Sequence, residues 1–217
     1  MGLFSWLVDL FYPPKCVLCG KLLEQEERDL CMECRKLPEQ EVRQISKPRK
    51  AASVTAVCYY EELVRESLLR YKFRDKPCYA QAYGRLLADK IRQAEIRYDL
   101  ITLVPVSARR RRRRGYDQAQ LLAQATAEAL GTEATATLCK HRDIPAQSGI
   151  QDAARRRANV LGVYRVLPQA AVQGKEILLI DDILTTGATL SEAIRMLLEA
   201  GAGEVHAAVF AAARKVK

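Results

Sequence analysis

Two adjacent aspartates followed by a threonine-rich turn are the residues of this sequence with the clearest chemistry. Asp181 and Asp182 end the apolar run EILLIDD, and the turn that follows contains Thr185, Thr186, Gly187, Ala188 and Thr189. In an open α/β sheet, ligands bind outside the carboxyl ends of the strands, and this turn follows such a strand end. Backbone N–H groups beside a helix N-terminus suit a phosphate group, and carboxylates accept hydrogen bonds from a sugar diol. We therefore predict a site for a phosphorylated sugar, with the aspartates on its hydroxyls and the turn on its 5-phosphate.

A second apolar run, LITLVPV at 100–106, is typical of a strand buried in a parallel sheet and is also followed by polar residues. Its end would lie at the same edge of the sheet as the threonine turn, and arginines occupy positions 109–114. Guanidinium groups bind pyrophosphate in bidentate fashion. We expect a pyrophosphate to bind at Val106, Ser107 and Arg114.

The rest of the arginine run needs another explanation, because these guanidinium groups cannot all reach one ligand. An exposed arginine run is most often a solvated surface. The alternative is contact with the phosphate backbone of a nucleic acid, for which the candidates are Arg109, Arg110, Arg111, Arg112 and Arg113. Few aromatic residues are available for base stacking, so backbone binding is favoured over base reading.

Four cysteines near the N-terminus have the spacing of a metal site. They form two C-x-x-C pairs, Cys16 with Cys19 and Cys31 with Cys34. Four thiolates complete a tetrahedral zinc shell and leave no open position, so the site should be structural. A redox pair or incidental cysteines are the alternatives. The other cysteines, Cys58, Cys78 and Cys139, are isolated in the sequence and are interpreted as small buried apolar residues.

The elements that must position these residues alternate along the chain. We expect strands at 53–60, 100–106, 176–182 and 205–212, and helices at 61–73, 79–96, 117–130 and 190–200. This alternation predicts a doubly wound α/β domain with a mostly parallel sheet. A proline-containing polar stretch suggests a boundary near residue 50, with an N-terminal helix and zinc module at 1–50 and the main domain at 51–217.

The run from 177 to 189 resembles the fingerprint of type I phosphoribosyltransferases: four apolar residues, two acidic residues, two apolar residues and T-T-G-x-T. The resemblance implies that Asp181 and Asp182 bind the 2- and 3-hydroxyls of 5-phosphoribosyl 1-pyrophosphate (PRPP) and act in catalysis. It also implies that the loop binds the 5-phosphate and that Mg²⁺ bridges the hydroxyls and the pyrophosphate.

Across almost the whole chain, the order of motifs is similar to the ComF family, which includes ComFC and GntX-type proteins. The matching stretches are 16–34, Tyr71-Lys72-Phe73, 104–119, the fingerprint, and Gln147, Arg156 and Asn159. Aspartate stands at position 117 where the family usually has asparagine, which removes an amide donor, and Ile144 stands where threonine is common. The resemblance implies a role in handling imported DNA during natural transformation.

Composition fits a folded protein with anionic partners. The chain has 217 residues, of which 49% are hydrophobic, and a net charge of +9. The apolar stretch at 3–12 is too short to cross a bilayer and lacks signal-peptide features, so we expect a cytoplasmic location. The leading hypothesis is a ComF-type PRPP-binding protein that acts in DNA uptake, with competence or DNA-processing proteins as partners. The alternatives are an active phosphoribosyltransferase of nucleotide metabolism with an unidentified acceptor, and a non-catalytic factor that binds single-stranded DNA and uses the ribosyl site as a sensor.

Overall fold

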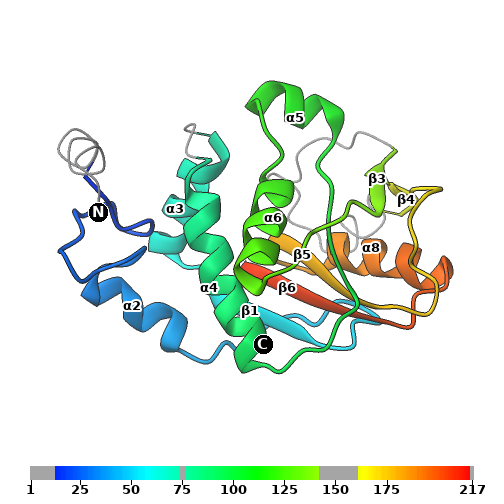
Figure 1. Ribbon diagram of the computed structural model, residues 1–217, viewed down its shortest axis with the longest axis horizontal. Helices are drawn as coiled ribbons and strands as arrows, with labels where there is room; N and C mark the ends of the chain where they lie inside the picture. Colours follow the sequence, from blue (N-terminus) through cyan, green and yellow to red (C-terminus); the bar gives the residue numbers. More distant parts are fainter. Residues whose placement is uncertain (1–12, 74–76, 142–160, 216–217) are drawn as a thin grey trace.

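A parallel β-sheet forms the centre of the protein (Figure 1). The computed structural model describes residues 13–73, 77–141 and 161–215. Within these residues the sheet contains β1 (Val54–Tyr59), β2 (Leu100–Leu103), β5 (Glu176–Leu184) and β6 (Glu204–Ala212). The strand order is β1-β6-β5-β2, and every neighbouring pair is parallel. The predicted parallel-sheet architecture is confirmed.

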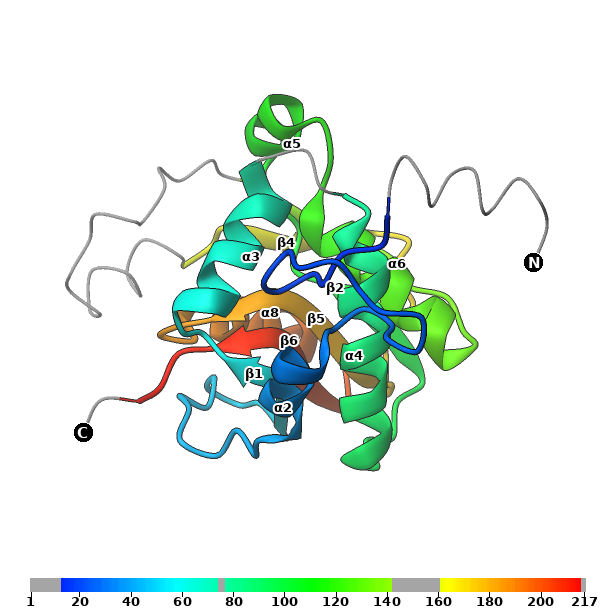
Figure 2. The same ribbon diagram turned by 90° about the vertical axis from the view of Figure 1, so that its left-hand side faces the viewer.

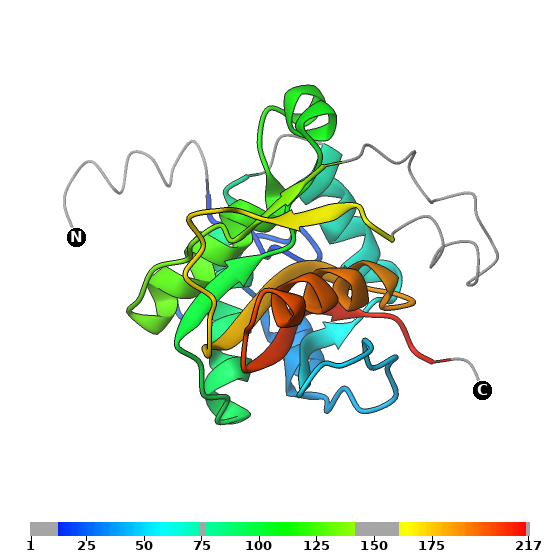
Figure 3. The same cartoon turned by 90° about the vertical axis from the view of Figure 1, so that its right-hand side faces the viewer.

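Helices cover both faces of the sheet. The helices α3 (Glu62–Phe73), α4 (Tyr79–Gln93) and α6 (Gln118–Leu130) lie on one face (Figure 2), and α8 (Ala188–Glu199) packs on the other (Figure 3). Leu178 and Ile180 of β5 belong to the core beneath α4 and α6, whereas Ile177 and Leu179 belong to the core beneath α8. Successive strand residues point to opposite faces, so a strand covered on both sides must be apolar throughout.

The early end of β2 opens one edge of β5. The sequence predicted a strand through residue 106, but β2 ends at Leu103, opposite Ile180. The Val104 amide still donates to the Ile180 carbonyl (3.0 Å); Pro105 then has no N–H with which to continue the ladder. On its other side, β5 stays paired with β6 as far as Leu184. The last residues of β5 therefore extend beyond β2 and leave room for a ligand.

The arginine run forms a helix that the sequence did not predict, α5 (Ala108–Arg114). Its N-cap is Ser107, whose Oγ accepts a hydrogen bond from the Arg110 amide (3.3 Å), and it ends at Gly115. Arginine has a high helix propensity, so the cap and the terminal glycine make the run a short helix that projects from the body in Figure 1. A second unpredicted element is a small antiparallel sheet of β3 (Leu138–Lys140) and β4 (Tyr164–Val166).

The cysteine-containing segment, which includes α2 (Met32–Glu39), packs on α3 and α4. Ser67 Oγ donates to the Val17 carbonyl, and the Arg70 guanidinium donates to the Leu18 carbonyl. Buried residues of the segment, including Leu18 and Leu30, share one hydrophobic core with α3 and α4. The division at residue 50 remains a prediction. Among the described helices, none has both the length and the apolar character that a bilayer crossing requires.

Candidate functional site

A cleft of about 440 Å³ lies at the open edge of β5. Asp181 and Asp182 lie on its wall, and Thr185 and Thr189 of the turn face the same space. The wall is completed by Ile183 of β5 and by residues from α3, the segment after β2, α5, α6 and the small β3–β4 sheet, namely Lys72, Val104, Pro105, Val106, Arg110, Ala119, Lys140 and Tyr164. Elements far apart in the sequence thus meet at the carboxyl end of the central strand, where α/β sheets bind ligands.

Charged side chains of both signs face each other in the cleft. The Lys72 ammonium lies 2.9 Å from Oδ1 and 2.8 Å from Oδ2 of Asp182, and these side chains are only 17% and 15% exposed. Arg110 and Lys140 add two further cations to the lining, and the Lys140 ammonium lies 5.7 Å from the centre of the Tyr164 ring. A ligand that carries both hydroxyls and several negative charges suits this arrangement.

The carboxyl of Asp181 has a strongly raised pKa. Burial raises the pKa of Asp181 to about 8, and the neighbouring Asp182 carboxylate and Asp117 add to the rise. The Asp182 backbone amide, which donates to Asp181 Oδ1 (2.8 Å), and the Lys72 ammonium oppose it. The carboxyl is therefore mostly protonated at neutral pH when the cleft holds no ligand.

This pKa predicts a specific pH dependence of stability. Between the ordinary value of 3.8 and about 8, folded Asp181 holds a proton that the unfolded chain releases. The free energy of unfolding should therefore fall as pH rises through this window, by at most about 1.4 kcal/mol per pH unit. Asp181→Asn lacks this term, so the stability of the natural protein relative to the variant should fall from pH 5 to pH 8. Urea unfolding of both proteins at each pH measures the difference, and parallel curves would contradict the prediction.

The turn after β5 is built to hold its backbone in one shape. Gly187 has φ +74°, a left-handed conformation that favours glycine, and it caps the N-terminus of α8. The Ser191 hydroxyl donates to the Gly187 carbonyl (2.6 Å). Thr185 and Thr189 line the cleft, whereas Thr186 and Ala188 line a separate cavity. The turn thus separates two spaces.

Asp117 holds the segment after β2 in place. One of its carboxylate oxygens accepts from the Val106 amide (3.3 Å), and the other accepts from the Gln120 amide (3.1 Å) and so caps α6. Ser107 is buried, and its side-chain oxygen accepts a hydrogen bond from the Arg110 amide. The Val106 amide and the Ser107 oxygen therefore already have protein partners. These hydrogen bonds fix the backbone at the edge of the cleft. The aspartate at position 117 acts as a helix cap that needs no amide donor.

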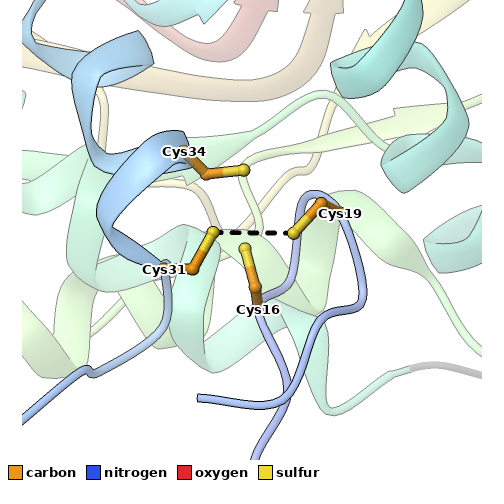
Figure 4. A group of neighbouring side chains, drawn as sticks. All are labelled: Cys16, Cys19, Cys31 and Cys34. Carbon is orange, nitrogen blue, oxygen red and sulfur yellow. Dashed lines mark hydrogen bonds between the residues drawn. The ribbon is translucent and has the colours of Figure 1, made fainter. Parts of the chain in front are cut away.

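Four cysteine sulfurs converge in the N-terminal segment (Figure 4). All four Sγ atoms, those of Cys16, Cys19, Cys31 and Cys34, lie within 4.8 Å of one another, and the Sγ atoms of Cys19 and Cys31 are 3.6 Å apart. A zinc–sulfur bond of about 2.3 Å gives a tetrahedron with an edge of about 3.8 Å. The cluster therefore has the size that a tetrahedral zinc ion requires.

Comparison with known proteins assigns the chain to a family. The phosphoribosyl transferase domain family matches residues 75–217, and the double zinc ribbon domain family matches residues 7–49. The DNA utilization protein YhgH of Salmonella typhi is 30% identical over 170 residues, which are 76% of this chain and 74% of that protein. This chain belongs to the ComF-type phosphoribosyltransferases. Competence protein ComFC of Bacillus subtilis is 28% identical to this ComF-type chain over 196 residues, 86% of this chain and 72% of that protein. The solved allosteric regulatory enzyme of purine biosynthesis aligns at 26% identity and a TM-score of 0.45, over 65% of this chain and 29% of that one.

In this ComF-type chain, the zinc-ribbon match and the cysteine geometry together support a structural zinc ion. The four thiol groups surround one point, and the residues of the cluster are buried or half-buried. A closed shell of four thiolates leaves no position for a substrate. The ion would therefore fix the fold of the N-terminal segment.

The cleft of the ComF-type protein also contains residues that sequence reasoning did not assign. Lys72, Lys140 and Tyr164 line it, and Arg110, expected on a nucleic acid, faces it as well. The one feature of the sequence that pointed to Lys72 was its position in the stretch Tyr71-Lys72-Phe73, which resembles the ComF family. Outside the described residues lie the expected N-terminal helix, Ile144, Gln147, Arg156, Asn159 and the side chains of Arg113 and Arg114.

Proposed function

We propose that the cleft binds PRPP together with Mg²⁺. The observation that carries this proposal is the position of Asp181 and Asp182 at the open end of β5, directly before the turn that begins α8. The carboxylates would accept hydrogen bonds from the 2- and 3-hydroxyls of the ribose. The 5-phosphate would lie at the helix N-terminus beside Thr185 and Thr189.

The pyrophosphate of PRPP would extend toward the cations of the cleft. Lys72, Arg110 and Lys140 come from three different elements and line the same space. Mg²⁺ binds substrate phosphate oxygens and keeps several waters, so it would enter with the donor and reduce the charge of the pyrophosphate. Burial raises the Asp181 pKa to about 8, so this carboxyl would lose its proton only when Mg²⁺ enters close to it, because a nearby cation favours the carboxylate.

Two uses of such a site follow from the chemistry. In an enzyme, the carboxylates would stabilise the positive charge that develops on the ribose as pyrophosphate leaves and an acceptor attacks. In a sensor, the donor would bind without reacting. The relatives named for DNA utilization and competence favour a role in the handling of imported DNA, and DNA-processing proteins are the partners that such a role would involve.

A nucleic-acid contact at α5 is the second candidate function. Arg109, Arg111 and Arg112 are exposed on this projecting helix (Figure 1). Exposed guanidinium groups attract a phosphate backbone and release its counterions. This contact needs no chemistry in the cleft.

Calorimetric titration of the protein with PRPP in MgCl₂ tests the proposal. We expect saturable binding at one site per chain that is weakened when MgCl₂ is omitted. The absence of saturable binding to the folded, zinc-loaded protein would refute the proposal. Measuring pyrophosphate release with a panel of purine and pyrimidine bases then separates the enzyme, which releases it with at least one acceptor, from the sensor.

A further inference from the structure

A second cavity lies on the other side of the threonine turn, with a volume of about 640 Å³. Its wall includes Thr186 of the turn, the segment that follows the zinc module, the first part of α8 and the C-terminal segment after β6. We call it the basic cavity because Lys47, Arg49, Lys50 and Lys215 line it. None of these residues lines the PRPP cleft.

The charge of the basic cavity is strongly positive. Five lysine and arginine residues line it; those at 47, 49, 50 and 215 are exposed, and the fifth, Arg195, is paired with Glu192. The one acidic residue in its described lining, Glu192, is buried and already paired: its carboxylate lies 2.7 Å from Arg195 and accepts the Gly162 amide (2.6 Å). This carboxylate therefore does not neutralise the exposed cations, which can attract an anionic ligand from solvent.

The backbone that carries these cations is fixed to the domain. The Arg49 amide donates to Ser191 Oγ (2.9 Å), and the same hydroxyl donates to the Gly187 carbonyl of the turn. Pro48 is buried, with its Cα 3.4 Å from the position that a Cβ on Gly187 would occupy. The Lys215 amide donates to the Gln44 carbonyl (2.8 Å). Hydrogen bonds to the rest of the domain thus hold the backbone of the cavity wall in place.

We propose that the basic cavity binds the phosphodiester backbone of single-stranded nucleic acid. Its cations come from chain segments far apart in the sequence and are spread around a hollow much larger than one phosphate group, which suits a chain of phosphates. A duplex is stiff over about 150 base pairs and does not bend into such a hollow, whereas a single strand does. Leu161, which is 62% exposed, and the aliphatic parts of the lysines offer apolar contact for sugars and bases.

This site goes beyond PRPP binding and does not depend on it, but the two sites would share one turn. Thr186 faces the basic cavity, and Thr185 faces the cleft. A strand held in the basic cavity would therefore lie directly behind the proposed phosphate-binding backbone. The arginines of α5 form a different surface, and the experiment must separate the two.

Two variants with equal charge change separate them. Arg49→Gln with Lys50→Gln and Lys215→Gln removes three charges from the basic cavity, and Arg109→Gln with Arg111→Gln and Arg112→Gln removes three from α5. Both lower the net charge from +9 to +6, which is 9 minus 3. Anisotropy of a labelled single strand of about 20 nucleotides, measured over a range of NaCl concentrations, reports affinity and salt dependence.

We expect the cavity variant to lose at least about tenfold in affinity and its slope of log K against log salt to fall by about 2, because each lost phosphate contact removes about 0.7. The α5 variant should stay within about threefold of the natural protein. Arg49→Lys with Lys50→Arg and Lys215→Arg keeps the charge and should bind normally. Melting temperatures and PRPP titration check that the cavity variant is folded with an intact cleft, so a failure here is distinct from a failure of PRPP binding.

Several results would overturn the inference. Equal losses in the two charge-removing variants would show a diffuse electrostatic effect, and a loss confined to the α5 variant would place the strand on the arginine helix. Binding of a duplex of the same length as tightly as the single strand would contradict the shape argument. Displacement of the strand by an equimolar amount of inorganic pyrophosphate would show that the cavity is a small-anion site.

Discussion

Replacing Cys34 with serine should remove the zinc ion and lower the midpoint of thermal unfolding by roughly 10 °C. Cys34 is buried in α2 and supplies one of the four converging sulfurs. Structural zinc contributes about 10–16 kcal/mol of apparent binding free energy in zinc-finger peptides. Loss of even about 3–5 kcal/mol shifts the midpoint of a chain of this size by roughly 10 °C, at about 2–4 °C per kcal/mol.

Cys78→Ser is the matched control, because Cys78, which the sequence analysis expected to be buried, is exposed at the start of α4 and lies outside the cluster. The two variants make the same chemical change in one chain. Zinc content after dialysis, measured by mass spectrometry, and calorimetric melting should distinguish them. If Cys34→Ser still retained one zinc ion per chain, or melted at the same temperature as Cys78→Ser, the cluster would not be a structural zinc site.

The effect of zinc loss should also reach the cleft. Val17 and Leu18, next to the first cysteine pair, accept hydrogen bonds from Ser67 and Arg70 of α3. Near the end of the same helix, Lys72 forms an ion pair with Asp182. Disorder in the zinc module would loosen α3 and with it the lysine, so the Cys34→Ser protein should also bind PRPP more weakly.

The sequence predicted the parts of the site that lie on one continuous segment. The apolar run, the acidic pair and the turn at 177–189 are encoded locally, and their strand and helix were predicted nearly to the residue. The end of β2 before Pro105 could have been predicted from the sequence as well, since proline lacks an amide hydrogen. Its consequence, an unpaired edge of β5, depends on which strands are neighbours.

Contacts between distant segments could not be read in the same way. Lys72 and Asp182 are 110 positions apart in the sequence, and their pairing depends on how α3 packs. The division of the turn between two spaces depends on Pro48 and Arg49 lying against Gly187 and Ser191. No periodicity or spacing within the turn shows that Thr185 and Thr186 face different cavities.

Asp182→Asn should weaken PRPP binding by about 10- to 100-fold, although it makes the cleft more positive. If the cleft attracted anions by charge alone, removing this carboxylate and freeing Lys72 from its ion pair would tighten binding. Unit charges about 4 Å apart interact by about 4 kcal/mol at the effective dielectric of a protein surface. If Asp182 holds the ribose hydroxyls, binding should weaken, because hydrogen bonds to charged groups contribute about 1.5–3 kcal/mol. The two explanations predict opposite signs.

Inorganic pyrophosphate isolates the charge effect, because it carries the phosphates but no ribose diol. Its affinity for Asp182→Asn should stay the same or rise, while the affinity for PRPP falls. Asp89→Asn, which makes the same charge change on the exposed surface of α4, should alter neither. Calorimetric titration of all three proteins with both ligands in MgCl₂ gives the comparison. Tighter PRPP binding by Asp182→Asn would show that Asp182 does not hold the sugar, since a diol contact makes the loss of this carboxylate unfavourable even for an anionic ligand.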